Sequence, residues 1–184
     1  YYVRGGELVN FVGVVEREGW QVEGWLETGE ISELKQDFAP WCSTVHQLID
    51  AADETTCFKW ALFDRDPLPS WSKGRVTLLG DACHPMLPFM AQGACMAIED
   101  AWVLATELGE SDDPARAFLA YEVQRKKRTA RVQMAARANA KRFHKGAPAG
   151  QLATYGPMWL AARIKPDLLK KPFDWIYGAN VTKA

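Results

Sequence analysis

A segment near the middle of the chain constrains the fold more than any other. Residues 75–79 form a short apolar run, and Gly80-Asp81 follows it directly. A loop interrupted by prolines then leads to Gln92-Gly93, where a pattern of helical periodicity begins. In α/β sheets, ligands bind beyond the carboxyl ends of parallel strands, where such a carboxylate would lie. The pattern therefore predicts a buried parallel strand over residues 75–79, a ligand-binding loop and a helix from residue 92.

The helix expected from residue 92 has a stripe of small and apolar side chains that we predict to be buried: Ala94, Ala97, Ile98, Ala101, Ala105 and Leu108. The polar residues on its other side are Glu99, Asp100, Thr106 and Glu107. The first N–H groups of a helix favour negative charge by roughly 0.3–2 kcal/mol. The carboxylate of Asp81 can accept hydrogen bonds from sugar-like hydroxyls and would repel phosphate. These groups predict an anionic or electron-rich ligand.

The first 15 residues are predicted to form a β-hairpin, because Gly5-Gly6 can supply the positive φ angles of a tight turn. Both faces of the second strand are mostly apolar, so we expect it to be covered on both sides or to face a cavity. Asn10 is the polar exception. Two interpretations stay open for it: an edge residue with a satisfied amide, or a polar group in a ligand pocket.

The rest of the chain is predicted as a series of helices, strands and connections. In chain order these are a turn or strand over 19–25, a helix over 31–38, a helix capped by Ser43 with Val45, Leu48, Ile49 and Ala52 buried, a strand over 57–63, a connection over 64–71, and a long helix from Asp113-Pro114 to about Lys145. A tail rich in aromatic residues follows, and it must pack on something.

The bulk composition suits one globular domain, or one domain and a piece of another. Hydrophobic residues make up 48% of the chain, and the formal net charge is −1. No apolar run is long enough for a membrane span and no signal peptide is visible, so we expect no membrane partner. The four cysteines (Cys42, Cys57, Cys83 and Cys95) show no CxxC spacing. Reduced cysteines in a cytoplasmic protein are the simplest interpretation.

A zinc site could be imagined from Cys42 and His46, four residues apart on a helix, together with Cys83 and His84. Adjacent residues such as Cys83 and His84 seldom chelate one metal together. We therefore predict no metal site.

The central segment resembles the second flavin motif of the FAD-dependent, single-component aromatic-ring monooxygenases. The family pattern is G-D-A-x-H, a proline, then G-Q-G and a helix with E-D-A. The residues that match it are Gly80-Asp81-Ala82-Cys83-His84, Pro88, Gln92-Gly93 and Glu99-Asp100-Ala101, and Ala91 stands where the family often has the first glycine of G-Q-G. Tyr121-Glu122 with Arg125 and Arg128 is similar to the family's Y-E-x-x-R-x-x-R stretch. Residues 38–41 and 64–68 resemble the salicylate hydroxylase branch.

The resemblance implies a role for each matched residue. Asp81 would bind the ribityl chain of FAD, and Pro88 would lie near the reacting edge of the isoalloxazine ring. The backbone that meets the pyrimidine end would belong to Ala91, Gln92, Gly93 and Ala94. NADH or NADPH would reduce the flavin, and O₂ would supply the oxygen that enters an aromatic acid or phenol. The candidate substrate contacts are Asn10, Phe11 and Pro88.

No general base can be assigned from the sequence. Related hydroxylases often carry a histidine after the aromatic residue of an F-x-G-W-type segment, where this chain has Cys42 after Trp41. His46, one turn later, could substitute, or it could be a solvent-facing residue. His84 of the flavin motif either positions the flavin ring or fixes the loop by a hydrogen bond. The catalytic candidates are therefore His46, Cys42 and His84.

The expected fold class is α/β with α+β elements, as a partial FAD/NAD(P)-binding monooxygenase fold. Residues 1–72 would form half of a substrate-domain sheet with two helices, residues 73–111 the strand–loop–helix that completes the FAD domain, and residues 112–184 a long helix and an aromatic tail. No G-x-G-x-x-G follows a strand in this sequence. We expect the C-terminal half of an enzyme, inactive alone, that associates or forms homo-oligomers through the surface left by the other half.

Two other functions are open. The long helix is markedly basic, which would suit a nucleic acid or an acidic partner. Its apolar positions and the net charge of −1 favour a solvated helix face instead, so we expect no nucleic-acid partner. The second alternative is a flavoprotein fragment without hydroxylase activity.

Overall fold

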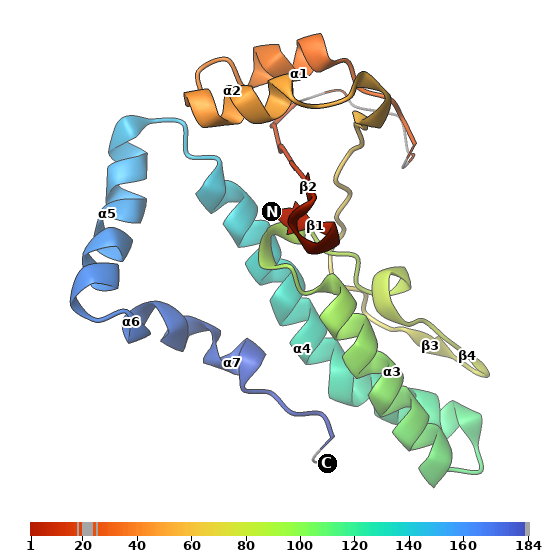
Figure 1. Cartoon of the computed structure of the whole chain (residues 1–184). Coiled ribbons are helices and arrows are strands. Elements are labelled where there is room, and N and C mark those ends of the chain that lie inside the picture. Colours follow the sequence, from red (N-terminus) through yellow and green to blue (C-terminus); the bar gives the residue numbers. More distant parts are fainter. Residues whose placement is uncertain (18, 20–23, 25, 183–184) are drawn as a thin grey trace. The chain divides into compact units, whose positions relative to one another are not determined.

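The structure is a computed structural model that describes residues 1–17, 19, 24 and 26–182. It divides into two compact units, Tyr1–Leu62 and Phe63–Ala184, and each is described by itself. Helices and short strands both occur (Figure 1), so the mixed fold class is confirmed. The turn or strand predicted over residues 19–25 lies mostly outside the described residues. The division into three functional parts stays a prediction.

The first unit begins with the predicted hairpin. β1 (Tyr2–Val3) pairs antiparallel with β2 (Leu8–Val9), and the 3-10 turn η1 (Arg4–Gly6) joins them. Gly5 and Gly6 have φ angles of 68° and 100°, as the tight turn requires. Both residues of β2 are exposed. Within the described residues β1 is the only pairing partner of β2, so the covering expected on both faces is not found, and the alternative, that this strand faces a cavity, stays a prediction.

Two helices and a 3-10 turn follow in the first unit: α1 (Ile31–Asp37), α2 (Ser43–Asp50) and η2 (Glu54–Thr56). Phe38 and Ile49 are buried, with 5% and 1% of their surface exposed, whereas Ala52 of the predicted stripe is exposed. Ser43 is the first residue of α2 rather than its cap. Cys42 holds the cap position, and its side chain makes no capping bond, so that prediction is wrong.

The strand predicted over residues 57–63 is also wrong. A single antiparallel bridge forms there, between Thr28 and Phe58. The ammonium group of Lys59 binds the carboxylate of Glu33 at 2.7 Å. A strand needs a continuous ladder of backbone hydrogen bonds, and this aromatic segment is held by one bridge and side-chain contacts instead.

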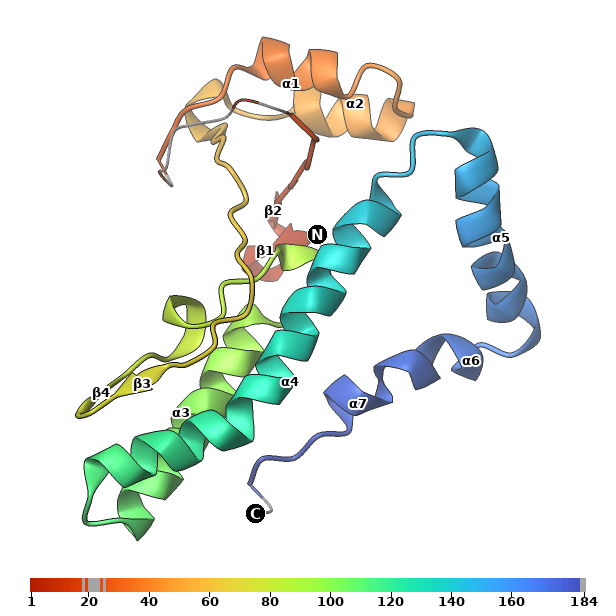
Figure 2. The same cartoon turned by 180° about the vertical axis from the view of Figure 1, so that it is seen from behind.

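The strand predicted over residues 75–79 differs most from the structure. β4 (Val76–Thr77) is two residues long and pairs antiparallel with β3 (Ser72–Lys73) (Figure 2). Gly74, at a φ of 59°, turns the chain back between them. Val76 is 65% exposed. The buried parallel strand is therefore wrong, because the partner of β4 among the described residues is the preceding antiparallel strand.

The core of the second unit lies between two long helices that run side by side in Figures 1 and 2, α3 (Gly93–Glu110) and α4 (Pro114–Phe143). Asp113 caps α4 as predicted, because its side chain accepts a hydrogen bond from the backbone N–H of Ala115 at 3.0 Å. The buried apolar cluster consists of Trp71, Cys83, Val103 and Tyr121.

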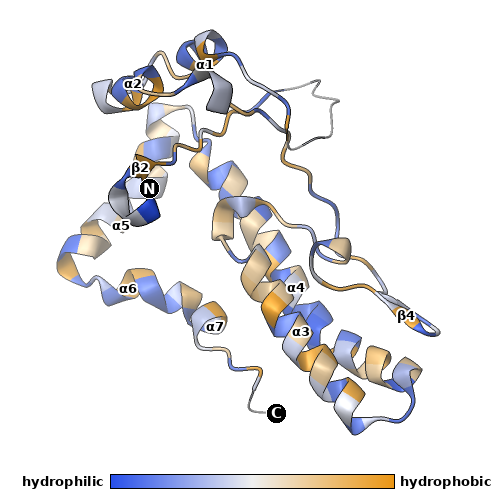
Figure 3. Cartoon of the chain, turned by 45° about the vertical axis from the view of Figure 1, so that its right-hand side comes forward, coloured by the Kyte–Doolittle hydropathy of each residue, from blue (hydrophilic) through white to orange (hydrophobic). Residues whose placement is uncertain are grey.

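α3 buries a different face from the predicted one. Its buried residues are Met96, Asp100 and Val103, which recur at helical spacing. Most of the predicted stripe is exposed, with Ile98 at 71% and Leu108 at 42%, whereas Ala97 is half-buried. Figure 3, coloured by hydropathy, shows hydrophobic positions along α3. The acidic side turns inward because arginines of α4 pair with it.

Four helical elements follow α4: α5 (Pro148–Ile164), α6 (Asp167–Lys170), η5 (Lys171–Phe173) and α7 (Asp174–Tyr177). The guanidinium of Arg128 in α4 donates hydrogen bonds to the backbone oxygens of Trp175 and Ile176 at 2.8 and 3.1 Å. Of the aromatic tail, α7 thus packs on α4, whereas Trp159 and Leu160 of α5 are 58% and 51% exposed. Within the described residues, we find no helix that is both long and apolar enough to cross a membrane.

Replacing Asp113 by Ala should lower the free energy of unfolding by about 1 kcal/mol, because α4 loses its capping acceptor. Urea unfolding followed by circular dichroism measures this change. Asp112→Ala is the matched control, since Asp112 is exposed and caps no helix. Its stability should stay within about 0.5 kcal/mol of the parent. Equal losses in both variants would contradict the assignment of the cap.

Candidate functional site

The loop between β4 and α3 carries most of the residues predicted to bind a ligand. Two 3-10 turns shape it, η3 (Gly80–Ala82) and η4 (Pro88–Met90). Gly80 has a φ of 60°, and a Cβ atom there would lie 3.2 Å from the Cβ of Ala97 in α3. Glycine suits both this backbone angle and this close approach. Gly80 therefore places the start of the loop directly against α3.

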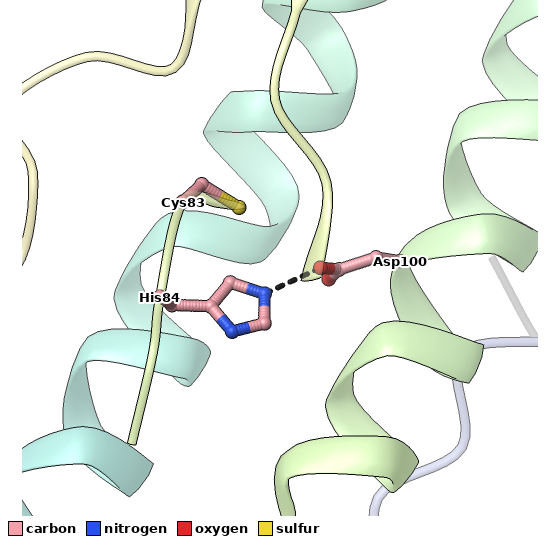
Figure 4. Close-up of side chains that lie close together, drawn as sticks. All are labelled: Cys83, His84 and Asp100. Atoms are coloured by element: carbon pink, nitrogen blue, oxygen red, sulfur yellow. Dashed lines mark hydrogen bonds and ion pairs between the residues drawn. The ribbon is translucent and has the colours of Figure 1, made fainter. Parts of the chain in front are cut away.

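One carboxylate of α3, that of Asp100, holds the loop. Its Oδ2 accepts hydrogen bonds from Nε2 of His84 at 2.5 Å and from the backbone N–H of Gly80 at 3.3 Å. Figure 4 shows the His84 ring directed at this carboxylate. Its Oδ1 accepts from Nε of Arg125 in α4 at 2.8 Å. Because the three residues are at most 1% exposed, their side chains form a buried polar network.

The charges of this network balance one another. Burial by itself would raise the pKa of Asp100, but hydrogen bonds and charge from His84 and Arg125 hold that pKa below its usual value. Burial acts in the same way on the pKa of Glu99, and Arg128 and Arg125 again lower it overall. Glu99 lies 2.7 Å from Arg125 and 2.8 Å from Arg128. Both acids are therefore ionised at neutral pH.

The Y-E-x-x-R-x-x-R stretch of α4 joins the same framework. The hydroxyl of Tyr121 donates to the backbone oxygen of Leu78 at 3.2 Å. Glu122 accepts hydrogen bonds from two backbone N–H groups at the start of β3, each at 2.9 Å. Sequence reasoning missed these structural roles. The sequence signal that could have indicated this framework is the acidic pair Glu99-Asp100 in α3 together with Arg125 and Arg128, three residues apart in α4.

Cys83, His84 and Asp100 bring three possible metal ligands within 4.8 Å of one another. The thiol of Cys83 donates to the backbone oxygen of Gly80 at 3.3 Å. Burial, and then the charge of Asp100, raise the pKa of Cys83 to about 12, so the thiol stays protonated at neutral pH. Arg125 binds the same carboxylate. These features favour a structural role for Cys83, His84 and Asp100 in fixing the loop over a role as metal ligands. The expected lack of a metal stays a prediction.

An accessible part of the loop presents the residues expected to bind flavin. Oδ1 of Asp81 lies 4.0 Å from the position that a Cβ of Gly93 would take, so the carboxylate stands beside the first turn of α3. Gln92 is the N-cap of α3, and its side chain makes no capping bond, which leaves the first N–H groups open. The exposed members of the predicted set are Asp81, Pro88, Ala91 and Ala94. The accessible surface of the loop therefore places the carboxylate of Asp81, a hydrogen-bond acceptor, beside the first backbone N–H groups of α3, which are donors.

Ala91 has a left-handed backbone between η4 and α3, with a φ of 50°. It stands at the first glycine of the G-Q-G pattern. Its N–H donates to the backbone oxygen of Pro88 at 2.9 Å, which closes the turn. An L-residue with a side chain costs roughly 1–2 kcal/mol in this conformation. The chain therefore holds a mildly strained alanine at the entrance to α3.

The remaining candidate residues lie in the first unit and have local partners. Nε2 of His46 donates to the backbone oxygen of Phe38 at 3.1 Å. Phe11 packs edge-on against Phe38, with ring centroids 5.6 Å apart. The amide of Asn10 donates to the hydroxyl of the first residue at 2.6 Å, and Cys42 is exposed. These contacts favour the local interpretation of Asn10, and the catalytic and substrate roles stay predictions.

Comparison with known proteins agrees with the flavin motif. The family described as the FAD binding domain matches residues 27–136. This chain belongs to that family. The 6-hydroxynicotinate 3-monooxygenase of Bordetella bronchiseptica is 45% identical over 98% of the chain and 41% of its own length. The 3-amino-4-hydroxybenzoate 2-monooxygenase PtnB3 of Streptomyces platensis is 41% identical over 93% of the chain and 41% of its own length.

Solved structures of this family have the same fold. A salicylate hydroxylase substrate complex matches 99% of the chain and 44% of its own chain, with a TM-score of 0.71 and 28% identity. Klebsiella pneumoniae HpxO complexed with FAD matches 75% of the chain and 37% of its own, with a TM-score of 0.67 and 33% identity. The resemblance to FAD-dependent aromatic hydroxylases is thus confirmed. The chain spans about two fifths of the length of the curated relatives it matches.

Asp100→Asn should lower the free energy of unfolding at pH 7 by about 3 kcal/mol or more, because it removes the buried carboxylate that binds the guanidinium of Arg125 and the ring of His84. The folded pKa of Asp100 is depressed, so its stabilisation is present above the unfolded pKa and is lost as the pH falls through the folded pKa. The parent should therefore lose stability below about pH 4, and the variant should lose less. Urea unfolding at several pH values measures both.

The control for that variant is Asp66→Asn. Asp66 binds Arg137 at 2.7 Å, but its side chain is 88% exposed. Removal of an exposed ion pair should cost about 1 kcal/mol at most. Similar losses in the two variants would show that burial of Asp100 contributes nothing.

Ala91→Gly should raise the free energy of unfolding by up to about 1 kcal/mol, because glycine tolerates the left-handed backbone. Ala105→Gly is the control within α3, where the same change should cost about 1 kcal/mol. If thermal unfolding shows a gain of stability in Ala91→Gly and a loss in Ala105→Gly, the result would support a strained backbone at Ala91. A loss of stability in both variants would exclude strain at Ala91.

Proposed function

We propose that this chain carries part of the flavin site of an FAD-dependent monooxygenase that hydroxylates an aromatic acid or phenol. The observation that carries the proposal is the carboxylate of Asp81 beside the open first turn of α3. Membership of the FAD binding domain family supports the cofactor. Two relatives are named 6-hydroxynicotinate 3-monooxygenase and 3-hydroxybenzoate 6-hydroxylase, and these names support the reaction and the substrate class.

The residues of the loop fit a flavin. Asp81 would accept hydrogen bonds from the ribityl hydroxyls, since an ionised carboxylate offers only acceptors. The N–H groups of Gly93 and Ala94 would face the pyrimidine end of the ring, where reduced flavin carries negative charge. Gly93 has no side chain to keep a ligand from the backbone. Pro88 would stand near the reacting edge. Bound flavin supplies the transfer of electrons from NADH or NADPH to O₂ and of one oxygen atom to the substrate.

His84 would serve this site by positioning. Its ring is 1% exposed and bonded to Asp100, so it holds the loop whose end is formed by Ala91 and Gln92. The loop-fixing interpretation is therefore the one we propose. His46 and Cys42 as proton-handling groups, and Asn10 and Phe11 as substrate contacts, also stay proposals.

The contacts of the basic helix favour the enzyme over a nucleic-acid binder. Arg125 and Arg128 are bound to acids of α3. Arg137 lies 2.6 Å from Asp64, and its pKa is raised by that hydrogen bond. Much of the positive charge of α4 is therefore already paired. The partners that we propose are a small aromatic substrate and O₂, with copies associating through exposed apolar faces such as that of α3.

Titration of the chain with FAD, followed by flavin fluorescence, tests the site. Asp81→Ala should weaken binding about tenfold or more, because a hydrogen bond to a charged group contributes about 1.5–3 kcal/mol. Asp112→Ala should leave the affinity unchanged. If Asp81→Ala folds normally and binds FAD as tightly as the parent, the proposed flavin site is wrong.

A second measurement tests the reaction in the protein that carries this chain. Oxidation of NADH or NADPH should accelerate when salicylate, 3-hydroxybenzoate or 6-hydroxynicotinate is added. Labelled O₂ should then place one labelled oxygen atom in the ring product. FAD binding without labelled product from any aromatic acid or phenol would favour the non-hydroxylating flavoprotein instead.

A further inference from the structure

Two adjoining hollows lie between η4, the end of α4 and the C-terminal segment of the second unit. The larger has a volume of about 460 Å³, within the range of about 300–1,000 Å³ that is usual for small-ligand sites. Its aromatic walls come from Phe89, Phe143, Phe173 and Tyr177. The smaller, of about 220 Å³, shares Phe173 and adds the side chain of Arg142. Together they form a groove, which we name the C-terminal groove.

The walls of the C-terminal groove are held in place by several contacts. Ile176 is 3% exposed and anchors α7. The guanidinium of Arg131 lies 3.7 Å from the ring centroid of Trp175, which lines the smaller hollow. The rings of Phe89 and Phe143 meet edge to face at 6.1 Å. A groove with aromatic walls suits a flat ring, because aromatic pairs favour edge-to-face and offset-stacked contacts.

The charge in the C-terminal groove is positive. Arg142 is exposed, and its guanidinium forms no ion pair among the described residues. The side-chain amide of Asn139 donates to the backbone oxygen of Phe89 at 3.2 Å, so that donor is already engaged. Arg142 is therefore the group best able to meet an anion. A guanidinium binds carboxylates well because its parallel N–H groups match the two oxygens.

We propose that the C-terminal groove binds a planar aromatic carboxylate, with its ring between Phe89 and Phe173 and its carboxylate at Arg142. The inference rests on the proposed function and deepens it. Pro88 and Ala91 line the larger hollow and also belong to the proposed flavin loop. The groove would thus deliver or hold the aromatic acid beside that loop, and residues 171–177 would help determine which acids are accepted.

Calorimetric titration of the chain with benzoate tests this assignment, with benzamide as the uncharged analogue. Benzoate should bind the parent chain, and Arg142→Gln should weaken that binding about tenfold or more while leaving benzamide unaffected. Phe173→Ala should weaken both ligands. Arg163→Gln is the matched control, since Arg163 is an exposed arginine 4.1 Å from the ring of Trp159, away from the groove. It should bind benzoate like the parent.

Several results would overturn the proposal. These are no benzoate binding by the parent, equal affinity in Arg142→Gln with unchanged circular dichroism, or an equal loss in Arg163→Gln. A benzoate affinity that falls as the chain self-associates would instead assign the groove to a second copy. FAD titration separates the two proposals. Asp81-dependent FAD binding without Arg142-dependent benzoate binding refutes the groove alone, and the reverse result refutes the flavin site alone.

Discussion

The rest of the second unit depends on the hydrogen bonds and the ion pair that the buried carboxylate of Asp100 forms. This carboxylate binds the first and fifth residues of the Gly80–His84 stretch, and it also binds Arg125 from α4. A buried carboxylate is costly unless it is paired and its lone pairs are satisfied. Here three partners meet that need. Since they come from the loop and from α4, the same charge fixes the loop and sets which face of α3 is buried.

In this arrangement, the residues that hold the loop in place differ from the residues that are accessible to a ligand. His84 and Asp100 face inward and hold the loop, whereas Asp81 and the start of α3 are left accessible. A binding loop gains precision when its own backbone is held by contacts that the ligand does not touch. The long motif around residues 80–101 can then be understood as two sets of residues. One set would meet the flavin, and the other keeps the first in place.

The sequence predicted the parts whose signals are local. The hairpin turn at Gly5-Gly6, the cap at Asp113 and the helix predicted from residue 92, which begins at Gly93, all follow from backbone preferences of a few residues, and the structure confirms them. The buried face of α3 was predicted wrongly because hydrophobic periodicity ignores ion pairs between distant helices. Residues 75–79 were predicted as a buried strand because an apolar run is normally covered, whereas β4 pairs only with β3 among the described residues.

Hydrogen exchange of the chain with and without excess FAD, resolved to single peptides, tests the central claim most directly. Our account predicts that FAD slows exchange at the amides of residues 81–95, where the loop meets the first turn of α3. The amides around Asp100 should already exchange slowly in both states, because the buried network does not depend on the ligand. Protection confined to other segments, with residues 81–95 unchanged, would contradict the placement of the flavin at this loop.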